Sequence, residues 1–348
     1  MQTCWKLSIT TVAVYVDEDA SSRHIMDADE ANIIGNGPLR KRRCHPPRLR
    51  LSCENAEFAR SIRDASMTSI GPSDTALSTL DDKRAAKDYL RRHAPDIPLI
   101  PGYAGSSQDA AKLGKVAAQI GFPMLKASAG GQLYTELERV QPEAQRWIGS
   151  ADFILERYVE SSKHVEIQIL GDVHREVVSF FERDCSVQRR HQKVLEETPC
   201  AFLTDRTRQQ MIEFVVDAVE HPITEEVTGV DLVPLQLYAA AGGSLRALPT
   251  LQGLSPEGHA IECHLCAEDP RKNFFPEHGK IYLSCVSIYF DSMSPKIVVW
   301  APARVLAIEK TDQVLANTVC AAHHVIRHEE ICAHVMAYHL HGNKGKSA

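Results

Sequence analysis

Segments with two-residue alternation and segments with helical spacing follow one another along this chain. Residues 10–16 form a β-branched, apolar run, which predicts a buried strand. Polar and apolar residues alternate over 164–170 and apolar residues fill 177–181, so two more strands are expected there. Helical spacing is clear over 303–316. A chain that mixes both periodicities is predicted to be an α/β or α+β protein with several lobes.

Capping residues and proline breaks divide the first half of the chain into predicted helices. Ser73 is placed to cap a helix that runs to about Leu80, and Asp82 begins another that ends near Arg92. Periodicity predicts further helices over 55–62, 108–120 and 133–147, and strands over 122–126 and 153–156.

The segment 204–219 fits two patterns, and the choice bears on the chemistry discussed below. Apolar positions over 211–219 match a helix, whereas 212–216 is equally compatible with a strand. The next segment, 224–241, predicts one helix that ends near a Gly-Gly pair.

Composition limits the class of protein. With 348 residues, the chain can form two or three packed domains. Its net charge of −6 predicts neither a nucleic-acid nor a membrane partner, because both favour concentrated positive charge. The ten cysteines lack the spacing of a disulfide scaffold, and the first residues do not resemble a secretory signal. Reduced thiols in the cytoplasm are therefore expected, with a mitochondrial location left open.

Two short segments are weak candidates for ligand binding. Gly130 and Gly131 follow Lys126 and a predicted strand, so their backbone N–H groups could surround phosphate oxygens, although a plain turn would also explain them. His164, Glu166 and Gln168 alternate with apolar residues and share one face of a strand, which could equally be a solvated face.

The segment 182–197 is the strongest candidate site. Ionisable and amide side chains crowd these sixteen positions, among them Glu182, Arg183, Asp184, Gln188, Arg189, Arg190, His191, Lys193, Glu196 and Glu197. A solvated helix could have this composition, but the apolar strand before it and Cys185 within it favour the edge of a cleft. Clustered opposite charges shift one another's pKa and can hold an anion.

Several of these segments, in this order, resemble the biotin carboxylases, which are modules of acyl-CoA, pyruvate and urea carboxylases. The matching segments are 3–9, 27–30, 126–128, 155–158, 164–168, 182–193, 219–222, 258–263 and 290–293. The resemblance implies an ATP-grasp fold. A remnant Rossmann-like domain would cover 1–72, the ATP-grasp domain 73–255, and a C-terminal lobe 256–348, of which 321–348 is unmatched.

The resemblance also implies an activity and its residues. The family uses ATP to activate bicarbonate as carboxyphosphate and then carboxylates biotin, with Mg²⁺ or Mn²⁺ as the metal. The residues implied at the nucleotide are Lys83, Lys126, Gly130 and Gly131 for phosphates, Glu156 for adenine, and His164, Gln188 and His191 around them. Lys193 would hold bicarbonate, and Glu220, just before Pro222, would be the base that deprotonates it.

This sequence departs from the family in places that matter for catalysis. The first strand of the N-terminal domain is missing, and residues 36–53 replace a longer stretch. The strand that supplies one metal ligand and a catalytic arginine is absent before Val219. Glu213 matches the other metal ligand, provided that residues 212–214 form a strand rather than a helix.

Two hypotheses follow from these matches and losses. No Met precedes a Lys, so the biotin acceptor signature is absent, and an active chain would need a biotinylated carrier in trans, with a homodimer as a further expectation. The first hypothesis is an ATP-dependent biotin carboxylase component. The alternative is a catalytically impaired ATP-grasp remnant that serves as a nucleotide-binding or associative subunit.

Overall fold

The computed structural model divides the chain into two compact units. One unit contains Met1–Arg43 and Lys163–Ala348, and the other contains Cys44–Ser162. The structure describes residues 1–15, 20, 23–33, 55–81, 83–103, 115–116, 119–120, 124–127, 132–134, 154–159, 162–189, 192–213, 222–266, 268–269, 275–276, 279–281, 284–286 and 293–317.

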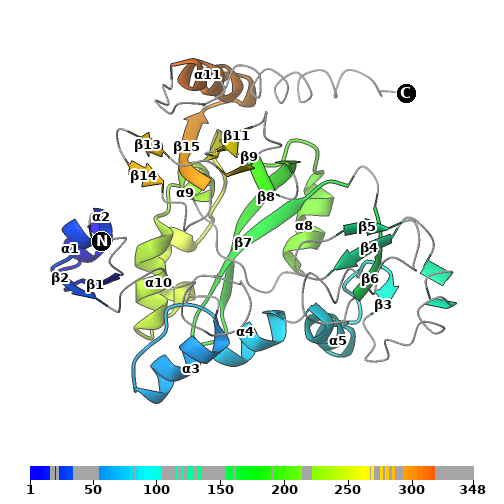
Figure 1. The fold of residues 1–348 in the computed structure, drawn as a ribbon, viewed down its shortest axis with the longest axis horizontal. Coiled ribbons are helices and arrows are strands. Elements are labelled where there is room, and N and C mark those ends of the chain that lie inside the picture. The colour runs from blue at the N-terminus through cyan, green and yellow to red at the C-terminus, as the bar shows by residue number, and fades with distance from the viewer. Residues whose placement is uncertain are drawn as a thin grey trace. The chain divides into compact units, whose positions relative to one another are not determined.

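A five-stranded antiparallel sheet forms the centre of the first unit. Its strands are β7 (Val165–Gly171), β8 (Val177–Arg189), β9 (Gln192–Thr198), β10 (His259–Cys266) and β15 (Met293–Ala301), in the spatial order β15-β10-β9-β8-β7. Figure 1 shows β7 and β8 as long green strands that run side by side. The strands predicted around 164–170 and 177–181 are confirmed, and β8 extends through most of the charged segment.

Helices cover both faces of this sheet. Helix α11 (Arg304–Ala316), predicted from its periodicity, packs Ala307, Ile308 and Leu315 against Ile261 of β10. On the opposite face, α9 (Pro222–Thr228) packs Ile223 and Val227 against Ala260. Since neighbouring residues of a strand point to opposite faces, Ala260 and Ile261 can serve the two cores separately. Each fully buried Ile or Leu contributes about 1.5–3 kcal/mol relative to an exposed one.

The helix predicted over 224–241 is two helices. Helix α9 ends at Thr228, and α10 (Leu232–Ala240) starts after Asp231, whose side chain accepts a hydrogen bond from the Val233 N–H. Gly229 between them has φ of +67°, a conformation that glycine adopts without steric cost. The 3₁₀ turns η5 (Leu245–Ala247) and η6 (Pro249–Leu251) follow α10.

The first residues form a small parallel pair of strands. Elements α1 (Gln2–Lys6), β1 (Val12–Tyr15), α2 (Arg23–Met26) and β2 (Glu30–Ile33) follow in order. The Asp29 carboxylate ties the entry of β1 by accepting hydrogen bonds from the backbone N–H and the hydroxyl of Thr11. Only Ala13 of β1 is buried, so the strand prediction is confirmed and the prediction that the whole strand is buried is wrong.

The second unit combines three helices with a four-stranded antiparallel sheet. Its elements are α3 (Ala56–Asp64), α4 (Asp74–Asp81), α5 (Lys83–His93), β3 (Gly102–Tyr103), β4 (Met124–Ala127), β5 (Gln132–Tyr134) and β6 (Ile154–Arg157), with strand order β3-β6-β4-β5. The predicted cap at Ser73 is confirmed, since its hydroxyl accepts a hydrogen bond from the Ala76 N–H. Leu133 lies in β5, so the helix predicted over 133–147 is wrong where it was expected to begin.

The segment 204–219, which the sequence left open between helix and strand, is a helix as far as the structure describes it: α8 covers Asp205–Glu213.

The remaining elements are two strand pairs, β11 (Glu268–Asp269) with β12 (Phe275–Pro276) and β13 (Gly279–Ile281) with β14 (Ser284–Val286). Among the helices that the structure describes, none has the length and apolar character needed to cross a bilayer.

The three-domain division of the sequence stays a prediction. Its boundary at 255/256 lies between β9 and β10, and these two strands pair directly within one sheet. Its boundary at 72/73 lies between α3 and α4, which pack together within one unit.

Candidate functional site

A set of charged side chains lies on one face of the five-stranded sheet, hereafter the ion-pair face. Its members come from all five strands: Glu166 on β7, Arg183 and Cys185 on β8, Lys193 and Glu196 on β9, Glu262 and His264 on β10, and Lys296 on β15. The register explains the grouping, because Glu166 stands opposite Arg183, Glu196 opposite Glu262, and His264 opposite Lys296. Directly opposed residues of antiparallel strands point to the same face.

Lys193, the predicted bicarbonate residue, lies at the exposed end of this set. Its Nζ is 2.8 Å from Glu166 Oε2 and 3.7 Å from Glu196 Oε2. The Arg183 guanidinium bridges the same two carboxylates, at 3.0 Å from Glu166 and 3.1 Å from Glu196. Arg183 is only 2% exposed, whereas the Lys193 side chain is 21% exposed and remains accessible to a small anion.

His264 continues the set into the protein interior. Its Nε2 lies 2.8 Å from Glu196 Oε1 and 3.1 Å from Glu262 Oε1. Lys296 Nζ lies 2.6 Å from the same oxygen of Glu262. His264, Glu196 and Glu262 are all buried, so these interactions are shielded from water and from salt.

The ion pairs set the protonation states on this face. Burial acts to raise the pKa of Glu196, but the hydrogen bond from His264 and the charges of Lys193 and Arg183 lower it to about 2. Burial acts to lower the pKa of His264, but its hydrogen bonds to Glu196 and Glu262 raise it to about 9. Burial and the Glu196 charge raise the pKa of the Cys185 thiol. His264 is therefore an imidazolium at neutral pH, and Cys185 is a neutral thiol.

The arrangement does not fit Mg²⁺. Two sets, Glu166–Cys185–Glu196 and Glu196–Glu262–His264, bring their potential ligand atoms within 4.8 Å of one another. However, the first contains a neutral thiol and the second an imidazolium, and neither is a ligand for Mg²⁺, which prefers oxygen. Arg183, Lys193 and Lys296 already neutralise the carboxylates.

Glu213, the predicted metal ligand, is the last residue of α8. The assignment depended on a strand at 212–214, and the helix at 212–213 removes that basis. The described residues therefore do not form the metal site that the resemblance implied, and no step proposed below passes through a metal.

Two residues predicted to surround the nucleotide lie next to this face. Gln188 stands opposite Lys193 in the register of β8 and β9, and its Nε2 donates a hydrogen bond to the Cys185 carbonyl at 2.9 Å. The backbone of His164 pairs with the same part of β8, since its N–H donates to Ser186 Oγ and its carbonyl accepts from the Cys185 N–H. The structure thus brings Lys193, Gln188 and the His164 backbone together on neighbouring strands.

The predicted residues of the second unit lie on elements that the structure describes only in part. Glu156 on β6 forms an ion pair with Lys87 of α5, and both side chains are 13% exposed. Lys126 on β4 stands opposite Leu155 in the register, next to Glu156, and Lys83 is the first residue of α5. Gly130, Gly131, His191 and Glu220 lie outside the described residues.

Sequence reasoning missed three residues of the ion-pair face and, in the other unit, the partner of Glu156. Lys87, Glu262, His264 and Lys296 were not singled out for chemistry. The signal for Glu262 and His264 was their two-residue spacing in a strand, which places both on one face. Cys263, between these two residues, is buried, and Cys4, Cys185 and Cys200 form no disulfide.

The opposite face of the sheet carries a second buried His–Glu pair. His259 Nε2 on β10 lies 2.9 Å from Glu197 Oε2 on β9. Arg304, at the start of α11, donates two hydrogen bonds to the same carboxylate, at 2.8 and 3.1 Å. On the same side of β8, Glu182 accepts a hydrogen bond from Arg208 of α8 at 2.7 Å. These contacts attach helices to the sheet.

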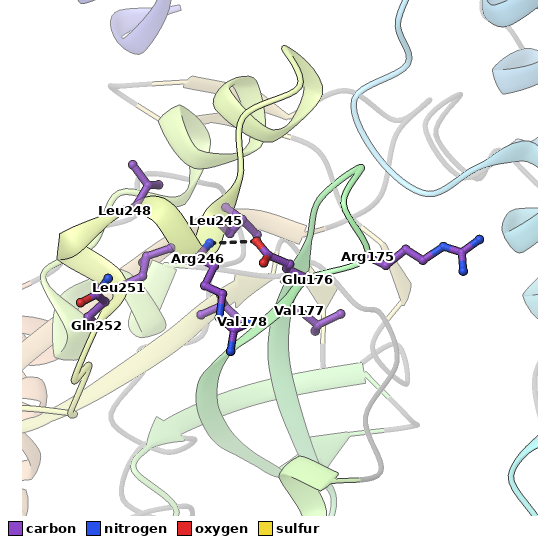
Figure 2. A pocket seen from close by; sticks show the side chains of 9 residues that line it. All are labelled: Arg175, Glu176, Val177, Val178, Leu245, Arg246, Leu248, Leu251 and Gln252. Carbon is purple, nitrogen blue, oxygen red and sulfur yellow. Dashed lines mark hydrogen bonds between the residues drawn. The ribbon is translucent and has the colours of Figure 1, made fainter.

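A pocket of about 400 Å³ lies elsewhere in the first unit, between the β7–β8 turn and the 3₁₀ turns (Figure 2). It is lined by Arg175, Glu176, Val177, Val178, Leu245, Arg246, Leu248, Leu251 and Gln252. The Glu176 carboxylate accepts hydrogen bonds from the Ser244 hydroxyl and the Arg246 N–H, the second of which is dashed in Figure 2. None of the predicted site residues lines this pocket, so size alone does not identify the site.

The sequence of this chain matches a family model and several known proteins. Residues 82–219 match the model of the carbamoyl-phosphate synthase L chain, ATP binding domain. The 2-oxoglutarate carboxylase small subunit of Hydrogenobacter thermophilus is 32% identical, over 90% of this chain and 82% of that protein. Biotin carboxylase 2 of Bacillus subtilis is 33% identical, over 91% of this chain and 88% of that protein.

The fold of this chain is also similar to solved structures of biotin carboxylases. One match is the biotin carboxylase domain dimer of the Hydrogenobacter thermophilus 2-oxoglutarate carboxylase, solved with MgADP, ADP and bicarbonate. It superposes on this chain with a TM-score of 0.77 at 28% identity, over 91% of this chain and 86% of that chain. Biotin carboxylase from Campylobacter jejuni, solved as a β-γ-ATP complex, gives 0.77 at 27% identity, over 90% and 87%.

The fold and these matches first define a class, the ATP-grasp proteins. Within that class, the chain belongs to the biotin carboxylase family. The alignment with the Hydrogenobacter protein spans 394 positions, more than the 348 residues of this chain, so the relative contains segments that have no counterpart here. This agrees with the losses inferred from the sequence.

Proposed function

We propose that this chain is the ATP-dependent biotin carboxylase component of a biotin-dependent carboxylase. The observation that carries the proposal is the charge balance around Lys193. With His264 protonated, the ion-pair face holds four cations, Arg183, Lys193, His264 and Lys296, against the three carboxylates Glu166, Glu196 and Glu262. Among these described groups the cations outnumber the carboxylates by one, and Lys193 is a partly exposed member of the set, which suits a small anion such as bicarbonate.

Bicarbonate is a poor nucleophile, so its reaction needs positioning, a base and neutralisation of charge. Lys193 holds the anion, and Glu220 takes its proton. The bicarbonate oxygen then attacks the γ-phosphorus of ATP, the bond to ADP breaks, and carboxyphosphate forms. Carboxyphosphate gives its carboxyl group to the ureido nitrogen of biotin, and the phosphate that leaves takes the proton of that nitrogen.

The residues that we assign to the nucleotide are those that the resemblance implies. Lys83, Lys126, Gly130 and Gly131 neutralise and surround the phosphates, and His164, Gln188 and His191 line the site. Glu156 lies at the adenine, and because its carboxylate is paired with Lys87, the contact to the base is made by the neighbouring backbone. Mg²⁺ or Mn²⁺ accompanies ATP in the proposed reaction. Biotin arrives on a separate carrier, and a homodimer is proposed by analogy with the dimer of the Hydrogenobacter domain.

The test uses the full chain and free biotin. We expect ATP hydrolysis that depends on bicarbonate, and a loss of at least about 100-fold in Lys193→Gln, because the variant lacks the cation at the anion site. Lys163→Gln is the matched control, since Lys163 is exposed and lies over the Phe202 ring. Folded wild-type protein without bicarbonate-dependent turnover, beside an active Bacillus biotin carboxylase, contradicts the proposal.

One observation favours a second candidate function. Helix α8 occupies residues where a metal-binding strand would be needed, and the described carboxylates near Lys193 are neutralised by protein cations. A nucleotide-binding or associative subunit would bind ATP without turnover. Calorimetric titration with ATP, with and without an intact biotin carboxylase subunit, distinguishes this candidate from an inactive chain that binds neither.

A further inference from the structure

Glu196 contacts both Lys193 and His264, and its two oxygens have different partners. Oε2 receives the Arg183 guanidinium at 3.1 Å and the Cys185 thiol at 3.2 Å, with Lys193 Nζ at 3.7 Å. Oε1 receives His264 Nε2 at 2.8 Å. The carboxylate is therefore fixed from both sides, and its orientation toward Lys193 depends on a group on the next strand.

We propose that His264 is a positioning residue for Lys193, which it orients through Glu196. The inference rests on the proposed function, since it assigns a role within that site. His264 is 4% exposed and sits between two carboxylates, so it does not itself meet bicarbonate or nucleotide.

The physical reason is competition for the Lys193 ammonium. Lys193 Nζ is close to Glu166 and more distant from Glu196, so it remains at the exposed end of the ion-pair face. Without the imidazolium, Glu196 Oε1 loses its partner, and the buried carboxylate gains by rotating toward the cations that remain, Arg183 and Lys193. Lys193 would then be drawn toward Glu196 and away from Gln188 and the anion site. A fixed second group is what maintains a binding residue in its working orientation.

The same strand provides a matched control for a merely structural effect. His259 is also buried on β10 and pairs with a glutamate of β9, at 2.9 Å, but on the other face of the sheet. His259→Gln removes the same kind of buried pair without touching the contacts of Lys193. A variant that only weakens the sheet should therefore behave as His259→Gln does.

Steady-state kinetics are the first test. We expect His264→Gln to raise KM for bicarbonate about tenfold, with KM for ATP within about twofold, because residues of one charged network are coupled at this level. His259→Gln should leave both KM values unchanged. Glu262→Gln removes one partner of His264 and should raise KM for bicarbonate in the same direction by less. Equal KM values for bicarbonate in His264→Gln and His259→Gln would overturn the proposal. If His264→Gln does not fold, Glu262→Gln takes its place, and an unchanged KM for bicarbonate in Glu262→Gln would overturn the proposal.

A second measurement separates this inference from the proposed function. Lysines are reductively ¹³C-dimethylated, which retains their charge, and the Lys193 signal is assigned by its loss in Lys193→Arg. We expect His264→Gln, or Glu262→Gln in its place, to shift the Lys193 signal, and His259→Gln to leave it at the wild-type position. If wild type shows no turnover, the proposed function fails while this signal still decides whether His264 controls Lys193. An unshifted signal overturns the inference.

Discussion

The two faces of the five-stranded sheet carry the same kind of buried pair but use it differently. Glu196 and Glu197 are neighbours on β9, and each pairs with a histidine of β10, His264 and His259 respectively. On the ion-pair face the network ends at the partly exposed Lys193. On the other face it ends at Arg304, which fixes the start of α11.

The comparison indicates that the role of a buried Glu–His network depends on the cation with which the network ends. Where the last cation lies on the sheet itself, as Lys193 does, the network can orient it toward an anion. Where the last cation belongs to a covering helix, the network holds that helix in place. The residue types alone do not separate these cases, because both contain a His, a Glu and a basic partner.

The largest expected effect comes from removing the charge at the centre of the ion-pair face. Glu196→Gln leaves the buried Arg183 with less compensation and His264 with a weaker acceptor, and should lower the free energy of unfolding by about 3–5 kcal/mol. Urea denaturation measures the loss. Glu226→Gln, at an exposed position of α9, should change stability by less than about 0.5 kcal/mol. A loss below about 1 kcal/mol in Glu196→Gln would show that the network is not coupled.

The pH dependence of stability tests the charge of His264. Because the folded-state pKa of His264 is raised from 6.5 to about 9, the stability that it contributes is complete below about pH 6.5 and is lost as pH rises through 9. The loss should reach about 3 kcal/mol. Glu196, with its pKa lowered from 4.5 to about 2, contributes stability above about pH 4.5 that is lost as pH falls through 2.

Urea unfolding of wild type between pH 5 and 10 should therefore decline on the alkaline side. His264→Gln should flatten this decline, whereas His259→Gln should retain it. If both variants retain it, the imidazolium of His264 is not the group responsible, and the two faces do not differ in the way described.

Both faces depend on the register of β10, which can be tested in the segment just before this strand begins. Gly258 and Gly253 both have φ of +72°, but a Cβ at Gly258 would lie 2.6 Å from the Ala301 carbonyl oxygen, whereas Gly253 has open space. Gly253→Ala should cost about 1 kcal/mol through backbone strain, and Gly258→Ala about 2 kcal/mol or more, because strand β15 must also shift. Thermal unfolding compares the two. Equal losses would mean that the close approach of β15 is unimportant.

The smallest expected effect is on the face that holds the helix. Arg304→Lys keeps the charge but loses the two-point contact with Glu197, and should cost about 1 kcal/mol without changing KM for bicarbonate. Arg206→Lys, on the exposed part of α8, is the control. A change in KM for bicarbonate in Arg304→Lys would contradict the separation of the two faces.

Much of this molecule could be predicted from local sequence pattern. Alternation located β7 and the start of β8, and helical spacing located α3 and α11, because each has one side against a core. Two helix predictions failed where the local sequence pattern does not distinguish the alternatives. The helix expected over 224–241 is broken at Gly229, and the segment expected as helix from 133 begins as strand.

The sequence by itself determined the family, the charged segment 182–193 and the candidate Lys193, because these are encoded in contiguous residues. Only the tertiary structure decided which charges act together. Glu166, Lys193, Glu262 and Lys296 are far apart in the chain, and strand pairing brings them to one face. A one-residue shift in register would exchange the two faces, so no local pattern could distinguish Glu196, which contacts Lys193, from Glu197, which holds α11.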